Sequence, residues 1–180
     1  MGGRIFESMS SLTDNRRLTY LALLSAMAIA LNLLETAMIP PLFGVFRIGL
    51  ANIIALVAWK ILGVKEMVIV NVMRVVIGSL LSGTFLGSTF WISSGGVVLS
   101  TCILLLGNLL KSSVVFTSVC SAIAHSFGQV LVVMFFYKQI MMLSTLPYFI
   151  LLSVPVGIFT GYIATVAIKR VKPLRKASHE

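Results

Sequence analysis

Few side chains in this sequence could take part in chemistry, and they stand among long apolar runs. Glu35 and Arg47 flank a short segment that contains Pro40 and Pro41, and Asn52 follows closely. Polar groups are costly inside a membrane, so each of these residues is a candidate for a functional site in a chain of this kind. Two interpretations stay open for Glu35 and Arg47: a salt bridge that fixes the segment, or a substrate pocket that the segment closes.

A second polar pair, His125 and Gln129, is separated by one helical turn. A metal site needs three or four ligands, and the only other histidine is His179 near the C-terminus, so no metal site is predicted. We interpret His125 and Gln129 as pocket-lining residues. Trp91 lies in a stretch rich in Gly and Ser over residues 87–100 and is expected near the mouth of the same pocket.

Sequence motifs for covalent chemistry or nucleotide binding are missing. The chain has no Gly-x-x-x-x-Gly-Lys-Ser/Thr loop, no Gly-x-Ser-x-Gly elbow and no His-Glu-x-x-His zinc motif. Its one aspartate, Asp14, cannot form the paired Asp-rich motifs that hold Mg²⁺ and a diphosphate. We therefore predict a protein that is not an enzyme, that has no cofactor, and that serves binding and passage of a small molecule.

The composition excludes a soluble globular enzyme. Of the 180 residues, 58% are hydrophobic and 11% are charged, against about 45–50% and about 25% in soluble domains. The net charge of +9 would suggest nucleic acid in a soluble protein. Membrane proteins collect Lys and Arg in their cytoplasmic loops, however, so we predict a lipid bilayer as partner and no nucleic acid.

The apolar runs predict an all-α, polytopic membrane protein with six transmembrane helices in one bundle. A polar N-terminal lead over residues 1–17 precedes a transmembrane domain over 18–168, and a basic tail over 169–180 follows it. The six predicted spans are residues 18–36, 48–63, 66–83, 90–110, 113–136 and 146–168. The second span is short for a bilayer, which needs about 20 residues.

The distribution of positive charges predicts the orientation. With the N-terminus in the cytoplasm, eleven of the fourteen Lys and Arg residues lie inside: Arg4, Arg16, Arg17, Lys60, Lys65, Lys111, Lys169, Arg170, Lys172, Arg175 and Lys176. Arg47 and Lys138 lie outside, and Arg74 falls within the third span. The positive-inside rule therefore predicts a multi-pass protein of the cell (cytoplasmic) membrane with both termini in the cytoplasm.

Asn71, Arg74 and Gly78 share one face of the third predicted helix. Arg74 lies roughly two turns from the cytoplasmic end, whereas Glu35 lies near the opposite surface. Glu35 is the only plausible acidic partner for Arg74 within a span. This mismatch in depth predicts a structural or coupling role for Asn71 and Arg74 and not ligand contact.

Small residues recur at four-residue spacing on several predicted helices. Ala22, Ala26 and Ala30 form one stripe, Gly157 with Gly161 form another, and Gly78 with Ser82 form a third. Such stripes let helix backbones approach closely in lipid. They indicate either packing within this chain or docking of a separate membrane subunit.

Three runs carry a family resemblance: Arg47-Ile-Gly-Leu-Ala-Asn-Ile-Ile-Ala-Leu, Gly63-Val-Lys-Glu-Met and Arg74-Val-Val-Ile-Gly-Ser-Leu-Leu-Ser-Gly. They resemble the Gx transporter family, also labelled heptaprenyl diphosphate synthase component I. The alanine stripe further resembles the first helix of S-components of energy-coupling-factor transporters. That resemblance implies a six-helix, S-component-like subunit whose Ala22, Ala26 and Ala30 face a transmembrane coupling subunit, with two cytoplasmic ATPases supplying energy.

Our leading hypothesis is a substrate-binding subunit for uptake of a small organic micronutrient. Its predicted pocket residues are Glu35, Arg47, Asn52, Trp91, His125 and Gln129. An alternative is a non-catalytic membrane component associated with isoprenoid, heptaprenyl diphosphate or quinone metabolism. A third is a structural membrane subunit without a ligand.

Overall fold

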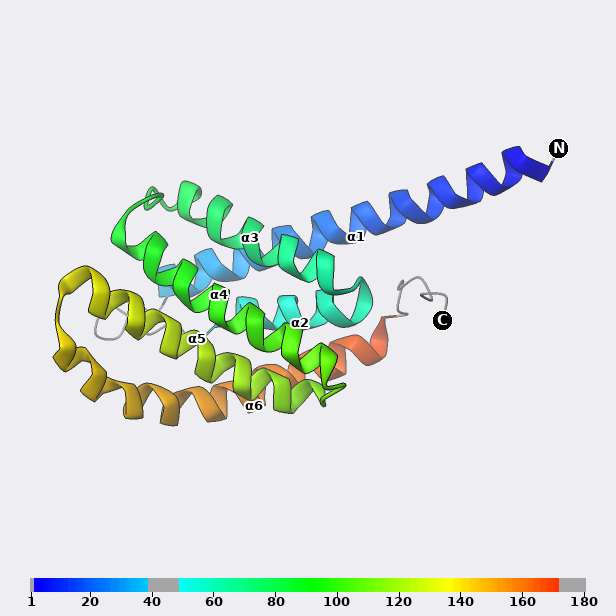
Figure 1. Ribbon diagram of the computed structural model, residues 1–180. Coiled ribbons are helices and arrows are strands. Elements are labelled where there is room, and N and C mark those ends of the chain that lie inside the picture. The colour runs from blue at the N-terminus through cyan, green and yellow to red at the C-terminus, as the bar shows by residue number, and fades with distance from the viewer. Residues whose placement is uncertain (1, 39–48, 172–180) are drawn as a thin grey trace.

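The computed structural model describes residues 2–38 and 49–171, with side chains described for residues 15–37 and 49–171. Six α-helices and one short 3-10 helix make up most of this part of the chain (Figure 1). They are α1 (Gly2–Met38), α2 (Ala51–Ile61), α3 (Val64–Leu81), α4 (Ser88–Leu109), α5 (Val114–Tyr137), η1 (Ile140–Thr145) and α6 (Leu146–Arg170). The described residues contain no strand, so the all-α prediction is confirmed.

The predicted boundaries hold to within two residues at both ends of α3, α4, α5 and α6. The first two helices differ more. Residues 2–17, expected as a lead, continue α1, whose N-terminal half projects beyond the other helices in Figure 1. The second helix is shorter than the predicted span over 48–63, because α2 begins at Ala51 and ends at Ile61.

Four stretches are long and apolar enough to cross a membrane: Asn15–Ala37, Ser88–Leu109, Val114–Tyr137 and Ile140–Arg170. They indicate a multi-pass membrane protein. With eleven residues, α2 is about 16 Å long, roughly half the thickness of a hydrocarbon core. In α3, Lys65, Glu66 and Arg74 interrupt the apolar sequence. By length and composition alone, α2 is therefore too short and α3 too charged to be identified as a membrane-crossing helix, unlike the other four.

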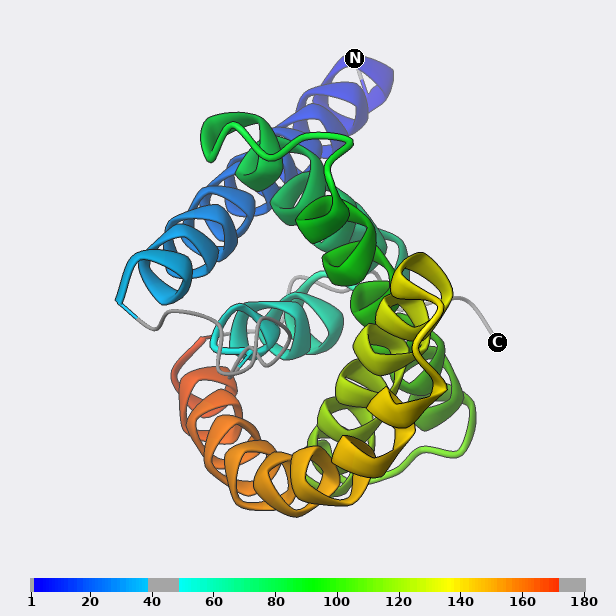
Figure 2. The same ribbon diagram turned by 90° about the vertical axis from the view of Figure 1, so that its left-hand side faces the viewer.

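The short helix α2 occupies the middle of the bundle, with the other helices around it (Figure 2). Ten of its eleven residues are buried, and Lys60 is the exception. A helix that is apolar all round is stable only when neighbours cover it on every side. Leu56 and Ile61 of α2, Met67 of α3 and Leu104 of α4 accordingly meet in the largest cluster of buried apolar residues.

Glycines set how closely α4, α5 and α6 pack. A Cβ atom on Gly128 of α5 would lie 2.4 Å from the carbonyl oxygen of Gly95 on α4. On α6, a Cβ atom on Gly157 or Gly161 would lie less than 3.0 Å from α5. The stripe of Gly157 and Gly161 is therefore used for packing within the chain. The alanine stripe of α1 is not, because Ala22, Ala26 and Ala30 are all exposed.

We expect Gly128→Ala to lower the free energy of unfolding by about 1–3 kcal/mol, the usual cost of overpacking. The added methyl group would meet backbone atoms of α4, which cannot rotate away as a side chain could. Thermal unfolding of the purified protein in detergent measures this effect. Val98→Ala is the control on the exposed face of α4, and equal stability of the two variants would contradict the tight α4–α5 contact.

Candidate functional site

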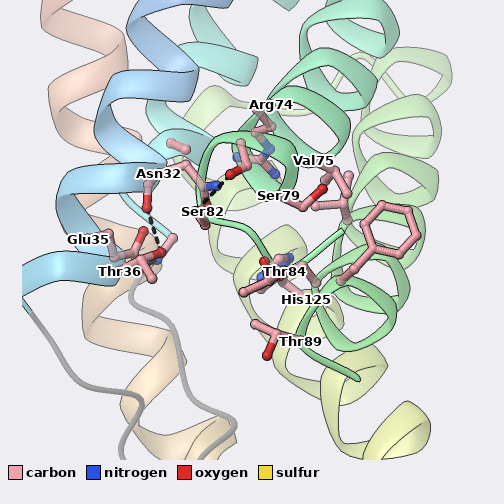
Figure 3. A pocket seen from close by; sticks show the side chains of 16 residues that line it. Asn32, Glu35, Thr36, Arg74, Val75, Ser79, Ser82, Thr84, Thr89 and His125 are labelled. Carbon is pink, nitrogen blue, oxygen red and sulfur yellow. Dashed lines mark hydrogen bonds between the residues drawn. The ribbon is translucent and has the colours of Figure 1, made fainter. Parts of the chain in front are cut away.

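A polar cavity lies at one end of the bundle, between α1, α3, α4 and α5 (Figure 3). Its polar lining consists of Asn32, Glu35, Thr36, Arg74, Ser79, Ser82, Thr84, Thr89, Ser93 and His125. The cavity volume is about 50 Å³. This is more than the roughly 10–15 Å³ that one water needs, and well below the roughly 300 Å³ at which pockets for drug-sized ligands begin. In this conformation the cavity accommodates a small polar molecule or one polar group of a larger ligand.

Glu35 joins the cavity to the central helix. Its carboxylate accepts the backbone N–H of Gly49 at 2.5 Å and that of Leu50 at 3.2 Å. These groups lie at the N-terminus of α2, where backbone N–H groups lack helical partners and the helix dipole favours negative charge. Glu35 is 4% exposed, so it holds the start of α2 in place while it lines the cavity.

Arg74 also lines the cavity, in the same space as Glu35 (Figure 3). The prediction that these two residues lie too far apart to share a site is therefore wrong. Arg74 is the eleventh of the eighteen residues of α3, past the middle of the helix and not near its start. The coupling role that we predicted for Arg74 and Asn71 stays a prediction, while the geometry places Arg74 in the lining of the cavity.

A buried hydrogen-bonded chain connects Arg74 of α3, through α2, to α5 and α4. The guanidinium donates to Asn52 Oδ1 at 3.4 Å, and Asn52 Nδ2 donates to Ser121 Oγ at 3.1 Å. Ser121 Oγ donates in turn to the Ser100 carbonyl at 3.4 Å. Asn52 thus positions Arg74 from α2, although it is absent from the cavity lining. One turn before Arg74, Asn71 donates to Thr101 Oγ1 at 2.8 Å.

His125 lines the cavity, whereas its predicted companion Gln129 lies beside it, beneath Gly96 of α4. A Cβ atom on Gly96 would lie 2.8 Å from His125 Cε1 and 2.9 Å from Gln129 Cγ. Gln129 is 1% exposed, and among the described residues neither its amide oxygen nor its amide nitrogen has a hydrogen-bond partner. A buried amide without partners is costly, so its retention needs an explanation.

Trp91 lies away from the cavity. It is 45% exposed and lines an apolar groove between α4 and α5 with Leu131, Val132, Phe135 and Phe136. Its neighbour Phe90 does line the cavity, and the two rings meet edge to face. The structure therefore brings Glu35 and His125 together, holds Asn52 and Gln129 just outside them, and separates Trp91. Arg47 lies outside the described residues.

Sequence reasoning missed most of the hydroxyl groups of the cavity. Ser79 lies at the end of α3, Ser82 and Thr84 lie in the connection that follows it, and Thr89 lies at the start of α4. Ser82 donates to the Gly78 carbonyl at 2.7 Å and Ser79 to the Val76 carbonyl at 2.8 Å, so both present oxygen lone pairs to the cavity. One sequence signal could have indicated Ser82 as a site residue. Ser82 follows Gly78 by four residues, and this spacing places it one turn beyond Gly78 on the face of α3 that carries Arg74.

We expect Glu35→Gln to lower the free energy of unfolding by about 1–3 kcal/mol. A glutamine keeps one acceptor oxygen but presents an NH₂ group where Leu50 or Gly49 needs an acceptor, and it removes the charge from the N-terminus of α2. Chemical denaturation in detergent measures the loss. Thr36→Val is the control, since the Thr36 hydroxyl donates to the Asn32 carbonyl of its own helix and, among the described residues, forms no hydrogen bond to α2.

Replacing Gln129 by the near-isosteric leucine is expected to raise the stability of the ligand-free protein by about 1–3 kcal/mol, because it removes an unpartnered buried amide. The same change is expected to weaken ligand binding about tenfold if the ligand supplies the missing hydrogen bonds. Thermal unfolding and equilibrium binding, measured on one preparation, give both quantities. A variant that loses stability would show that Gln129 already has partners in the ligand-free state.

The described residues contain no group of three or more His, Cys, Asp or Glu side chains that could hold a metal ion. What the cavity offers is one carboxylate, one guanidinium, one imidazole and a set of hydroxyls, in a helical bundle of membrane-spanning length. These features indicate a multi-pass membrane protein with a small polar cavity.

Residues 24–167, 144 of the 180 residues, match the family described as heptaprenyl diphosphate synthase component I, and the chain belongs to that family. The resemblance to the Gx transporter family, which carries this second label, is thereby confirmed. The resemblance to S-components has no such support. Comparisons with curated proteins and with solved structures give no match.

Proposed function

We propose that the protein binds a small polar solute, or the polar group of a small organic micronutrient, in the cavity of Glu35, Arg74 and His125, and serves as a substrate-binding subunit for uptake. The observation that carries this proposal is a polar cavity inside a bundle whose surroundings are apolar. Ionisable side chains in such positions are expensive and mark ligand or ion pathways. On the basis of the charge distribution, both termini lie in the cytoplasm, and α2 and α3 complete a six-helix membrane domain together with the four long apolar stretches.

The energy for uptake would come from a separate module. The sequence has no nucleotide-binding loop, so active uptake by this chain needs partner ATPases. The exposed stripe of Ala22, Ala26 and Ala30 offers a transmembrane coupling subunit a surface for close helix approach.

The family description supports a second candidate: a non-catalytic membrane component that works with another component of heptaprenyl diphosphate synthesis. The apolar groove beside Trp91, with a volume of about 460 Å³, would suit a prenyl chain. Mass spectrometry of small molecules that co-purify with the protein tests both candidates. A water-soluble micronutrient supports the uptake role, and a prenylated compound supports the second candidate.

A further inference from the structure

A second cavity, of about 230 Å³, opens at the end of the bundle opposite to the polar cavity. It lies where the turn between α2 and α3 meets α1 and α4. Its polar and aromatic lining consists of Arg17, Trp59, Lys65, Glu66 and Asn108. This cavity is larger than the cavity of Glu35 and Arg74, and nothing in the proposed function uses it.

Positive charge dominates this end of the bundle. Arg17 forms an ion pair with Glu66 and donates to the Leu62 carbonyl at 3.5 Å, and Lys65 lines the same cavity. Glu66 is the only acidic side chain that the structure describes at this end. The other described basic residues lie at the helix ends on this side: Arg16 in α1, Lys60 in the last turn of α2, Lys111 just after α4, and Lys169 and Arg170 in the last turn of α6. The local field therefore attracts an anion.

Backbone donors reinforce the positive charge. Gly63, Val64, Lys65 and Glu66 line the cavity at the N-terminus of the eighteen-residue helix α3. The first N–H groups of a helix have no partner within the helix, and Gly63 at the N-cap has no side chain to accept from them. Together with the guanidinium of Arg17 and the ammonium of Lys65, they form a donor set that matches phosphate oxygens.

The surroundings of the cavity indicate where such a phosphate comes from. Leu18, next to Arg17, is 64% exposed, and Leu109, next to Asn108, is 75% exposed. Exposed leucines at the end of apolar helices face hydrocarbon chains, while the cations beside them face lipid head groups. Basic pockets between membrane helices bind anionic phospholipids in this manner.

We propose that this second cavity binds the phosphate group of an anionic phospholipid, with Arg17, Lys65 and the start of α3 as its ligands. The site joins α1 to the α2–α3 turn, so a bound lipid would link the two segments in addition to the Arg17–Glu66 ion pair. The proposal does not depend on what the polar cavity at the other end binds.

The two tryptophans of the chain make a direct test practicable. Trp59 lines the second cavity, and Trp91 lies at the opposite end of the bundle. The substitution Trp91→Phe therefore leaves Trp59 as the only indole reporter. The full-length Trp91→Phe protein is placed in nanodiscs of phosphatidylcholine with rising fractions of phosphatidylglycerol. We expect a saturable change in Trp59 fluorescence, and native mass spectrometry should show a retained phosphatidylglycerol.

Charge-removal variants then locate the site. Lys65→Gln is expected to raise the half-saturating fraction of phosphatidylglycerol about fivefold, and Arg17→Gln about tenfold. Lys65→Gln leaves the Arg17–Glu66 ion pair intact, so it remains informative if Arg17→Gln fails to fold. Lys169→Gln is the matched control, because it removes one charge from the same end without touching the cavity.

Three results would overturn the proposal. Fluorescence that does not depend on phosphatidylglycerol would exclude the lipid site. An equal effect of Lys169→Gln and Lys65→Gln would show diffuse attraction in place of a site. A saturable response to inorganic phosphate in pure phosphatidylcholine nanodiscs, lost in Lys65→Gln, would show a site for a soluble anion and not for a lipid.

Discussion

Replacement of Arg74 by methionine is expected to weaken ligand binding about a hundredfold or more. Arg74 is the only cation of Lys or Arg type among the residues that line the polar cavity, and it is 4% exposed. Loss of one partner from a buried, hydrogen-bonded charged contact costs about 2–5 kcal/mol, which is roughly thirtyfold to several thousandfold in affinity. Equilibrium binding of the co-purifying ligand in detergent measures this change.

Two further variants make the Arg74 result specific. Arg74→Lys keeps the charge but loses the planar fork of donors, so an intermediate loss of about tenfold is expected. Lys169→Met, at the exposed C-terminal end of α6, should bind like the wild type. Wild-type affinity of a folded Arg74→Met protein would remove Arg74 from the site and restore the purely structural or coupling role that its position in the sequence suggested.

The sequence predicts the helices well because their ends have clear chemical signals. Gly63-Val-Lys-Glu breaks the apolar run between α2 and α3, and charged or Gly-rich connections separate the later helices. The start of α2 carries no such signal, since residues 48–63 are apolar throughout apart from Asn52 and Lys60. Residues 4–17 also carry no signal that would separate them from α1, because this polar stretch contains no Gly or Pro to end a helix.

The candidate site is only partly readable from the sequence, for a physical reason. A carboxylate or an imidazole in an apolar run stands out because it is costly in a membrane, so Glu35 and His125 could be found. Hydroxyls such as those of Ser79 and Ser82 donate hydrogen bonds to carbonyls of α3. Their burial in a membrane therefore costs little free energy, and the sequence does not mark them as site residues. The position of Arg74 along its helix depended on where α3 begins: the predicted start at residue 66 makes Arg74 the ninth of eighteen residues, and the observed start at Val64 makes it the eleventh.

The α1 stripe shows a different limit of sequence analysis. Small residues at four-residue spacing predict close helix packing, yet they do not say with which helix. The face of α1 that packs on the bundle carries Leu24 and Ala28, which are 7% and 0% exposed. Ala22, Ala26 and Ala30 point away from it. Packing within the chain therefore does not account for them, whereas it does account for Gly157 and Gly161.

Ala26→Leu is accordingly expected to abolish uptake of the ligand in cells while leaving binding by the purified protein unchanged. The added side chain points away from the bundle, so it does not enter the packing of the described helices and leaves the polar cavity intact. It would, however, hold a docked helix several ångströms from the stripe and prevent the close backbone approach that small residues permit. Uptake of labelled ligand and equilibrium binding in detergent are the two measurements.

The control for Ala26→Leu must add bulk to a lipid-facing position outside the stripe. Cys102 on α4 is small and exposed, so Cys102→Leu makes a change of similar size on another helix. We expect Cys102→Leu to retain both uptake and binding. Uptake that survives Ala26→Leu would show that the stripe is not a docking surface, and uptake by the reconstituted protein alone would show that no separate coupling module is needed. Loss of binding together with uptake would instead mean that α1 transmits the change to Glu35, which lies nine residues further along the same helix.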